Sequence, residues 1–136
     1  MECGNCSMVE EGRAAAEAML MMFACRSREA VREGRNQLFV DRNIFPQTLD
    51  VLLTRSEPFG IELIIDEYDE YEFTGKEFGA IVQYPAAAGA VRDYAAFTAA
   101  AHATAAPVTA VAGLLSPPLL QAAGARGARL AAGRTA

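Results

Sequence analysis

The alternation of apolar and polar positions is most regular between residues 36 and 63, where it predicts a strand, a helix and a second strand. Residues 37–40 form a short apolar run of β type, and after a polar break Pro46 suits the first turn of a helix. Three leucines at helical spacing give this helix an apolar face: Leu49, Leu52 and Leu53. Residues 61–65 are rich in β-branched side chains and predict the second strand. Two strands joined by a crossover helix pair in parallel, so the pattern indicates an α/β fold.

The connection between this helix and the second strand carries two signals for a helix end. Proline disfavours the α conformation at the residue before it, so Pro58 is expected to stop the helix at Glu57. Gly60 then accepts the positive φ that often follows a helix. Both signals place the helix end within residues 57–60.

A long helix is predicted near the N-terminus, from about residue 8 to about residue 30. Ser7 and Glu10 have the spacing of a capping box, in which each side chain bonds the backbone of the other residue. The segment consists mainly of Ala, Met, Leu, Glu and Arg, which are good helix formers. Residues 33–35 are expected to end the helix, and three arginines near that end suit its dipole: Arg26, Arg28 and Arg32.

The pattern continues through the second half of the chain. Residues 79–84 and 108–112 predict two further strands, and the helix between them, residues 91–103, should turn Tyr94, Phe97 and Ala101 inward. Residues 66–72 combine acidic and aromatic side chains without the spacing of a calcium-binding loop, so we interpret them as a solvated connection. The alternation of helices and strands predicts a mostly parallel sheet of about four strands, covered on both faces.

The last part of the chain differs from the rest. Pro117 and Pro118 interrupt an apolar run, and residues 122–136 consist mainly of Ala, Gly and Arg without a sustained apolar period. We therefore expect an α/β domain over residues 1–121 and a poorly ordered tail over residues 122–136.

Composition narrows the class of protein. A chain of 136 residues is about one domain, and its net charge of −5 argues against a nucleic-acid partner. Three cysteines, an odd number, indicate a reducing compartment rather than a disulfide framework. The apolar run at residues 18–25 is too short to span a membrane and does not follow a basic segment. A cytoplasmic location without membrane contact is the expectation.

Few side chains suggest chemistry on their own. Cys3 and Cys6 form a CxxC pair before the first helix, but no strand precedes it as in thioredoxin-like proteins, and we interpret the spacing as coincidental. His102, the only histidine, lies near the end of a predicted helix and is interpreted as a structural residue. Lys76, the only lysine, lies in a polar turn beside an acid and is expected to be exposed. No glycine-rich phosphate loop is present, so the residues alone predict no metal or catalytic site.

Several blocks of sequence, taken in order, resemble one family. They are an early segment that reads NCSMVEEGRAAAEAM, the helix start FPQT at residues 45–48, the turn TRSEPFGI at residues 54–61, the strand FGAIVQYP at residues 78–85, and RDY at residues 92–94. Together they resemble glycine dehydrogenase (decarboxylating), the P-protein family of the glycine cleavage system. The resemblance covers about residues 5–120 and is expected to fade at both ends.

The resemblance implies a fold, an activity and partners. The family is similar in fold to the type I pyridoxal-phosphate enzymes, so this chain would form part of a three-layer α/β/α sandwich. Members decarboxylate glycine and pass the aminomethyl group to the lipoyl arm of H-protein. They have two related halves, of which the second holds the cofactor lysine, whereas this chain matches part of the first. The resemblance therefore implies no pyridoxal phosphate on this chain, no activity alone, and the rest of the P-protein or its second subunit as partner.

The resemblance also suggests which residues face the substrate cleft, and where the chain departs from its relatives. Asn5, Ser7 and Glu11, at the mouth of the early helix, are the candidates for the cleft. Arg13 stands where the family usually has a small hydroxyl residue, and Gly113 stands where it usually has Asp after the fourth strand. A truncated or frame-shifted coding segment would explain the Ala/Gly/Arg tail.

Two other interpretations remain open. A free-standing, flavodoxin-like binding or interaction module would require a sheet with covered edges and an ordered tail. A thiol redox protein built on Cys3 and Cys6 is the weaker alternative.

Overall fold

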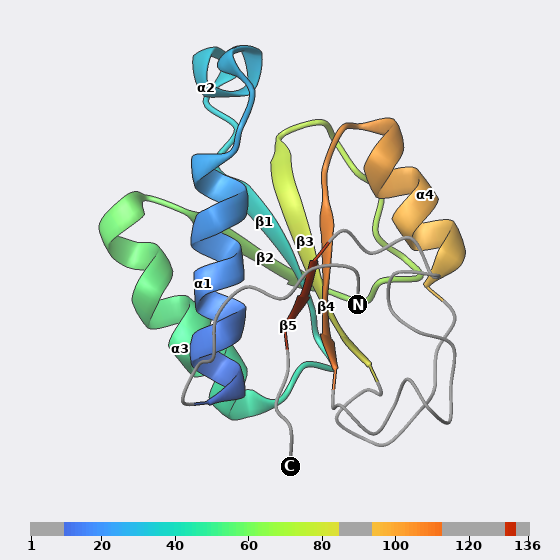
Figure 1. Cartoon of the computed structure of the whole chain (residues 1–136). Helices are drawn as coiled ribbons and strands as arrows, with labels where there is room; N and C mark the ends of the chain where they lie inside the picture. The colour runs from blue at the N-terminus through green and yellow to red at the C-terminus, as the bar shows by residue number, and fades with distance from the viewer. Residues whose placement is uncertain (1–9, 85–93, 113–129, 133–136) are drawn as a thin grey trace.

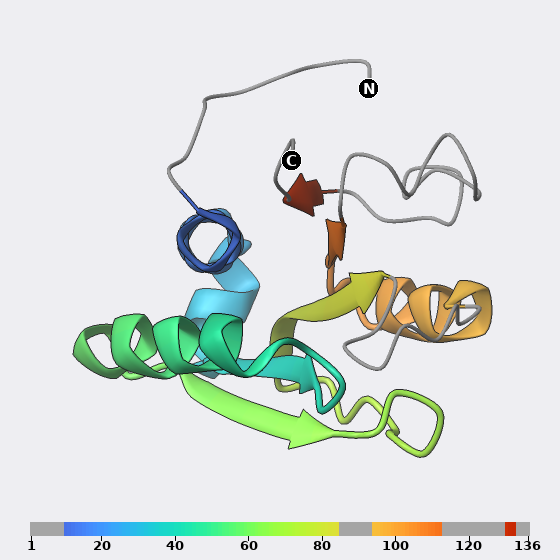
Figure 2. The same ribbon diagram turned by 90° about the horizontal axis from the view of Figure 1, so that it is seen from below.

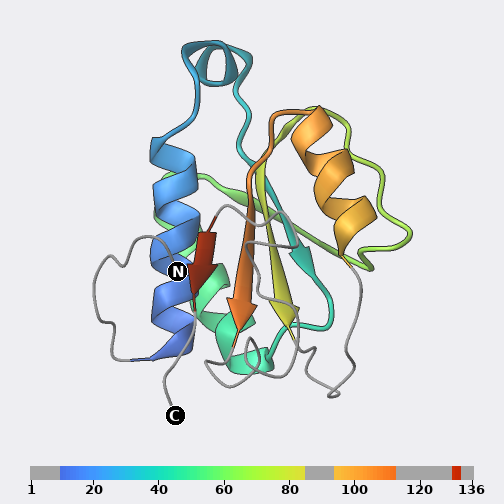
Figure 3. The same cartoon turned by 45° about the vertical axis from the view of Figure 1, so that its right-hand side comes forward.

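A computed structural model describes residues 10–84, 94–112 and 130–132, and within these residues the strands form one parallel sheet. The order across the sheet is β2-β1-β3-β4-β5, and every neighbouring pair is parallel (Figures 1 and 3). The strands are β1 (Gln37–Asp41), β2 (Glu62–Asp66), β3 (Glu77–Tyr84), β4 (Val108–Ala112) and β5 (Leu130–Ala132). The predicted α/β fold with a parallel sheet is confirmed.

Helices cover both faces of this sheet. Helices α1 (Glu11–Ala24) and α3 (Pro46–Ser56) pack on one face, and α4 (Ala95–Ala103) packs on the other, which gives three layers (Figure 2). Each face has its own apolar core. The first includes Met19, Leu38, Leu52 and Ile81, and the second includes Phe39, Val82, Phe97 and Val108.

One glycine permits the close approach of α1 to the sheet. A Cβ atom added to Gly79 in β3 would lie 2.7 Å from Met22 Sδ and 3.3 Å from the carbonyl oxygen of Pro107. Met22 is almost fully buried at this contact. A glycine at this position of β3 therefore lets the methionine side chain pack directly on the strand backbone.

The central strand–helix–strand unit forms as predicted, with β1 and β2 parallel and Gln37 opposite Glu62. The reason expected for its helix end is wrong. Glu57, which precedes Pro58, has φ −57° and ψ −49°, and the chain continues through a 3-10 turn, η1 (Glu57–Phe59). The turn ends at Gly60, whose φ of 66° is left-handed. A proline in the first turn of a 3-10 helix needs no N–H partner, so glycine alone ends the element.

The apolar face of α3 is narrower than its three leucines predict. Leu52 is fully buried and Leu49 is partly buried against the same core, but 45% of Leu53 is exposed. Thr48 and Ser56 are buried instead. These residues lie four positions before and after Leu52, so the buried stripe runs along positions 48, 52 and 56.

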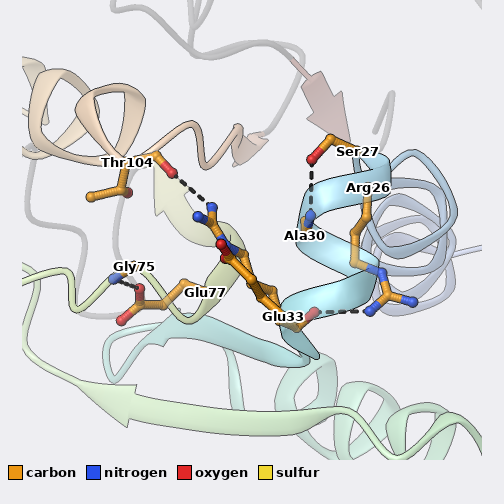
Figure 4. A network of polar contacts seen from close by, with 8 residues as sticks. Arg26, Ser27, Ala30, Glu33, Gly75, Glu77 and Thr104 are labelled. Atoms are coloured by element: carbon orange, nitrogen blue, oxygen red, sulfur yellow. Dashed lines mark hydrogen bonds and ion pairs between the residues drawn. The ribbon is translucent and has the colours of Figure 1, made fainter.

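The single long helix predicted for residues 8–30 is wrong. Helix α1 ends at Ala24, and a separate short helix, α2 (Arg28–Glu33), projects beyond the amino edge of the sheet (Figure 1). The Ser27 side chain accepts a hydrogen bond of 3.1 Å from Ala30 N and so begins the second helix (Figure 4). A serine that caps a new helix competes with continuation of the old one. Gly34, with φ 68°, ends α2 as expected.

The predicted sheet of about four strands has one more short strand among the described residues, because Leu130–Ala132 pairs in parallel with β4. One further expectation needs correction. Residues 67–76, which we call the strap, are not merely solvated. Their aromatic side chains pack on the α4 face of the sheet: Tyr68, Tyr71 and Phe73.

The remaining predictions for this half of the chain are confirmed where they can be compared. Tyr94, Phe97 and Ala101 are buried, and β4 has the predicted bounds. Residues 91–93 and 114–121 lie outside the described residues. Within the described part of the chain, no helix is long and apolar enough to cross a membrane.

Candidate functional site

The strand order identifies one place where ligands of parallel sheets usually bind. From β1 the chain passes through α3 to β2 on one side, whereas from β3 it passes through α4 to β4 on the other side. Between β1 and β3 the chain therefore changes direction across the sheet. In open α/β folds, ligands bind outside the carboxyl ends of the strands at such a switch point. The last residues of β1 and β3 are accordingly the first place to look for functional side chains.

A buried carboxylate lies at this place. Asp41, the last residue of β1, is fully buried, and its Oδ2 lies 3.0 Å from the hydroxyl of Tyr94, at the start of α4. The same hydroxyl lies 2.9 Å from the carbonyl oxygen of Gln83 in β3. The phenol has one proton to donate, and both oxygens are within reach of it. Tyr94 thus joins the ends of β1 and β3 beneath α4.

Asn43 holds the other oxygen of this carboxylate. Its backbone N–H and its Nδ2 both donate to Asp41 Oδ1, each at 3.1 Å. Nδ2 also donates to Glu67 Oε2 at 3.0 Å, so Asn43 connects Asp41 to the first residue of the strap. A buried carboxylate is costly unless hydrogen bonds replace its lost hydration, and Asn43 and Tyr94 supply three donors. These residues, Asp41, Asn43, Glu67 and Tyr94, form what we call the switch-point cluster.

Gln83 adds an unusual feature to this edge. Its Nε2 donates to Glu11 Oε1 at 3.2 Å and to the carbonyl oxygen of Val111 at 3.1 Å. Both partners are acceptors, which fixes the orientation of the amide. Gln83 is only 1% exposed. Among the side chains that the structure describes, its Oε1 is the buried polar atom that has no hydrogen-bond partner. An unpaired buried acceptor costs about 1–3 kcal/mol.

A second buried carboxylate lies at the opposite, amino edge. Glu77, the first residue of β3, is fully buried and accepts hydrogen bonds from the hydroxyl of Tyr71 and from the backbone and hydroxyl of Thr74. It also accepts a hydrogen bond from Gly75 N (Figure 4). Burial alone would raise the pKa of Glu77, but these hydrogen bonds outweigh it, so the pKa lies below its ordinary value. Burial and the Glu77 carboxylate raise the pKa of Tyr71.

The structure describes one of the three residues expected at the substrate cleft. Glu11 lies in the first turn of α1 and accepts a hydrogen bond from Gln83, while Asn5 and Ser7 lie outside the described residues. Cys3 and Cys6 also lie outside them. Lys76 is exposed, as expected from the sequence. His102 lies in the last turn of α4 and is exposed.

Only indirect signals for the switch-point cluster are present in the sequence. Asp41 is the first polar residue after an apolar run, and Tyr94 was expected only to pack inward. Nothing in their spacing shows that they meet, because 53 residues separate them and a helix and two strands lie between.

The chemistry of the carboxyl edge is that of hydrogen-bond acceptors. Asp41, Glu67, Glu11 and the unpaired Gln83 oxygen suit ligands or segments that carry N–H donors. The part of the chain that the structure describes holds no group of three or more His, Cys, Asp and Glu side chains suited to a metal ion. Lys76, the only amine side chain in the sequence, lies beside Glu77 at the opposite edge of the sheet.

Comparison with known proteins gives one consistent result. A family model described as glycine cleavage system P-protein matches residues 1–136, so the expectation that the resemblance fades beyond residue 120 is wrong. Glycine dehydrogenase (decarboxylating) from Bacteroides thetaiotaomicron is 47% identical over 135 residues, which are 99% of this chain and 14% of that protein. The protein of the same name from Nostoc punctiforme is 42% identical over 135 residues, which are 13% of its length.

A solved structure agrees with this result. The chain is similar to a crystal structure of glycine decarboxylase (P-protein) of the glycine cleavage system, in inhibitor-bound form, with a TM-score of 0.79 and 32% identity. The match covers 93% of this chain and 29% of that chain. The chain thus spans only a small share of the relatives it matches. Sequence and fold together show that it belongs to the glycine cleavage system P-protein family.

Proposed function

We propose that this chain is part of the glycine-decarboxylating enzyme of the glycine cleavage system, from the half that does not hold the cofactor lysine. Membership of the P-protein family supports the reaction: glycine decarboxylation, with transfer of the aminomethyl group to lipoyl H-protein. Coverage of 14% of a relative supports the assignment to a part, whose partner is the rest of the P-protein or its second subunit. Alone, the chain is inactive.

The position of the lysine carries this proposal. Pyridoxal phosphate is held through a Schiff base to a lysine amine, which must lie beside the cofactor. Lys76 is exposed and precedes β3 at the amino edge, whereas the switch point lies at the carboxyl edge. The described residues of the switch point offer acceptors and no amine. They do not fit the covalent attachment of pyridoxal phosphate, which the rest of the enzyme must provide.

The role left for this chain is to support the fold and to orient acceptor oxygens. Its carboxyl edge, with Glu11, Asp41 and Gln83, presents fixed acceptor oxygens toward the side of the sheet where ligands of this architecture bind. In the assembled enzyme this edge would line the cleft or support the half that carries the cofactor. Fixed acceptors of this kind can orient an N–H donor without reacting with it.

One experiment separates this proposal from its alternative. The purified chain is mixed with pyridoxal phosphate and reduced with borohydride, and modified lysine is mapped by mass spectrometry. We expect no stoichiometric, saturable adduct at Lys76; the Lys76→Ala variant, which has no lysine, measures the background labelling. Exchange of labelled CO2 with the glycine carboxyl group, in the presence of lipoyl H-protein, should appear only when the missing remainder of the P-protein is added. A saturable, stoichiometric adduct at Lys76 would overturn the proposal.

The alternative is a flavodoxin-like module that acts alone. The strand order β2-β1-β3-β4-β5 favours it, because flavodoxin-like proteins use the same order. It predicts a folded monomer that gains nothing from the rest of the P-protein. Failure of the added remainder to restore exchange, together with a monodisperse chain, would favour this second function.

A further inference from the structure

The strap takes the place of a helix on part of the α4 face of the sheet. It runs from the carboxyl end of β2 to the amino end of β3 beside α4 (Figures 2 and 3). Its aromatic rings stack closely on the core: Tyr71 lies 4.5 Å from Phe39 and Phe73 lies 5.2 Å from Phe97, between ring centroids. The strap is therefore fixed along its length by aromatic packing.

Both ends of the strap are fastened by buried or partly buried carboxylates. At the amino edge, Glu77 accepts the Tyr71 hydroxyl, both donors of Thr74 and the N–H of Gly75. At the carboxyl edge, Asn43 donates to Glu67 of the strap and to Asp41. Hydrogen bonds to charged groups are the stronger ones, so these two ends fix the path of the segment.

The strap also touches the phenol that holds the switch point. Tyr68 meets Tyr94 edge to face, with 4.7 Å between ring centroids and 67° between ring planes. Tyr94 in turn places its hydroxyl 3.0 Å from Asp41 Oδ2. A series of contacts therefore leads from Glu77 at one edge of the sheet to the carboxylate at the other. It passes from Tyr71 and Phe73 of the strap through Phe97 of α4 to Tyr68 and Tyr94.

We propose that Glu77 is a positioning residue for the switch-point cluster. Its carboxylate accepts the Tyr71 hydroxyl and so keeps the strap in place. The strap then keeps Tyr68 in contact with the Tyr94 ring, and this contact keeps the Tyr94 hydroxyl within hydrogen-bond distance of Asp41. The strap thus sets the direction of the acceptor oxygens at the carboxyl edge. This inference goes beyond the proposed function, because it needs neither cofactor nor partner and can be tested on the chain alone.

The test removes the charge of Glu77 and measures the far end of the strap. In the Glu77→Gln variant, NMR follows the exchange of the Tyr94 hydroxyl proton with water and the side-chain amide signals of Asn43. We expect Tyr94 hydroxyl exchange to accelerate about tenfold, comparable to the loss of one hydrogen bond, and the Asn43 amide signals to shift. Glu72→Gln is the matched control: it removes the same charge from an exposed residue of the same strap and should change neither signal.

An internal reference distinguishes a selective change at Tyr94 from a general loss of stability. The backbone amides of β4, Val108–Ala112, report global opening of the sheet. If Glu77→Gln accelerates exchange at β4 as much as at Tyr94, or leaves Tyr94 and Asn43 unchanged, the proposal is overturned. Should Glu77→Gln fail to fold, Tyr71→Phe removes only the phenol that Glu77 holds and must produce the same selective change at Tyr94. The outcome does not depend on decarboxylation, so failure here leaves the proposed function standing.

Discussion

Asp41 is the residue whose environment is best defined by its partners. A carboxylate with no exposed surface is tolerated only when hydrogen bonds replace water, and Tyr94 and Asn43 supply them. Tyr94 also reaches the carbonyl oxygen of Gln83. The hydroxyl therefore contacts both β1 and β3, and its removal weakens the link between the ends of these two strands.

Tyr94→Phe tests this role. The substitution keeps the ring in the core but withdraws a donor from a buried carboxylate, and we expect the free energy of unfolding to fall by about 2 kcal/mol. Urea denaturation measures the loss. Asp41→Asn and the double variant complete a thermodynamic cycle, in which a coupling energy near zero would show that the two side chains act independently.

Gln83 leads to a second prediction at this scale. Its Nε2 makes two hydrogen bonds, but its buried Oε1 makes none, so Gln83→Met exchanges two favourable bonds for the removal of one unfavourable atom. We expect a change in unfolding free energy of less than about 1 kcal/mol. Gln83→Glu places a second carboxylate beside Glu11 and should cost at least about 2 kcal/mol. Thermal and urea denaturation compare the two variants, and equal losses in both would contradict this explanation.

At the scale of elements, the strap shows how a loop can serve as a layer of the structure. Phe39 of β1 is fully buried on the α4 face of the sheet, although a loop rather than a helix covers part of that face. Tyr71 and Phe73 provide that cover, and Glu77 accepts the donors of the turn that follows them. Gly75, with φ 88°, permits the turn.

The pH dependence of stability should report the Glu77 end of the strap. Because folding lowers the pKa of Glu77 below its ordinary value of 4.5, the stabilisation is fully present above that pH. It is lost as the pH falls through the lower folded-state pKa. We expect Glu77→Gln to be about 2 kcal/mol less stable than the parent at pH 7, and this difference to shrink below pH 4.5.

Urea denaturation between pH 7 and pH 3 measures this difference. Glu72→Gln, an exposed neighbour in the same strap, serves as control and should follow the parent at every pH. A gap between Glu77→Gln and the parent that stays constant down to the lowest pH would contradict the assignment.

At the scale of the whole molecule, the end strand β2 leaves one edge of the described sheet unpaired. Within the described residues, β2 is the last strand on its side and pairs only with β1. Unpaired strand edges bind other strands, especially when they carry exposed apolar side chains. Ile65 of β2 is 37% exposed.

We therefore expect the isolated chain to self-associate through β2, and Ile65→Lys to weaken this association about tenfold or more, because an edge lysine opposes strand addition. Sedimentation velocity over a concentration series measures the association. Leu53→Lys is the matched control, since Leu53 is also a partly exposed apolar residue but lies on α3. Equal effects of the two lysines would point to general hydrophobic attraction rather than to the strand edge.

The extent to which the fold follows from the sequence is clear from particular elements. Strong local signals, such as Pro46 at a helix start, Gly34 and Gly60 at ends, and the β-branched run in β2, predicted bounds within one or two residues. The break between α1 and α2 was missed because good helix formers on both sides mask a single capping serine, Ser27. The three-residue strand β5 was missed because Ala-rich sequence has little intrinsic preference for strands, and pairing with β4 supplies it.

Most elements, the parallel α/β class and the family resemblance follow from the sequence, because propensity, periodicity and motif blocks are local properties of the chain. The strand order, the switch point, and the contacts of Asp41 with Tyr94 and of Glu11 with Gln83 depend on tertiary packing. These contacts join residues more than fifty positions apart, and their geometry depends on how several elements pack at once. A buried acceptor such as Gln83 Oε1 is therefore not visible in the sequence, where glutamine in a strand is only a polar residue.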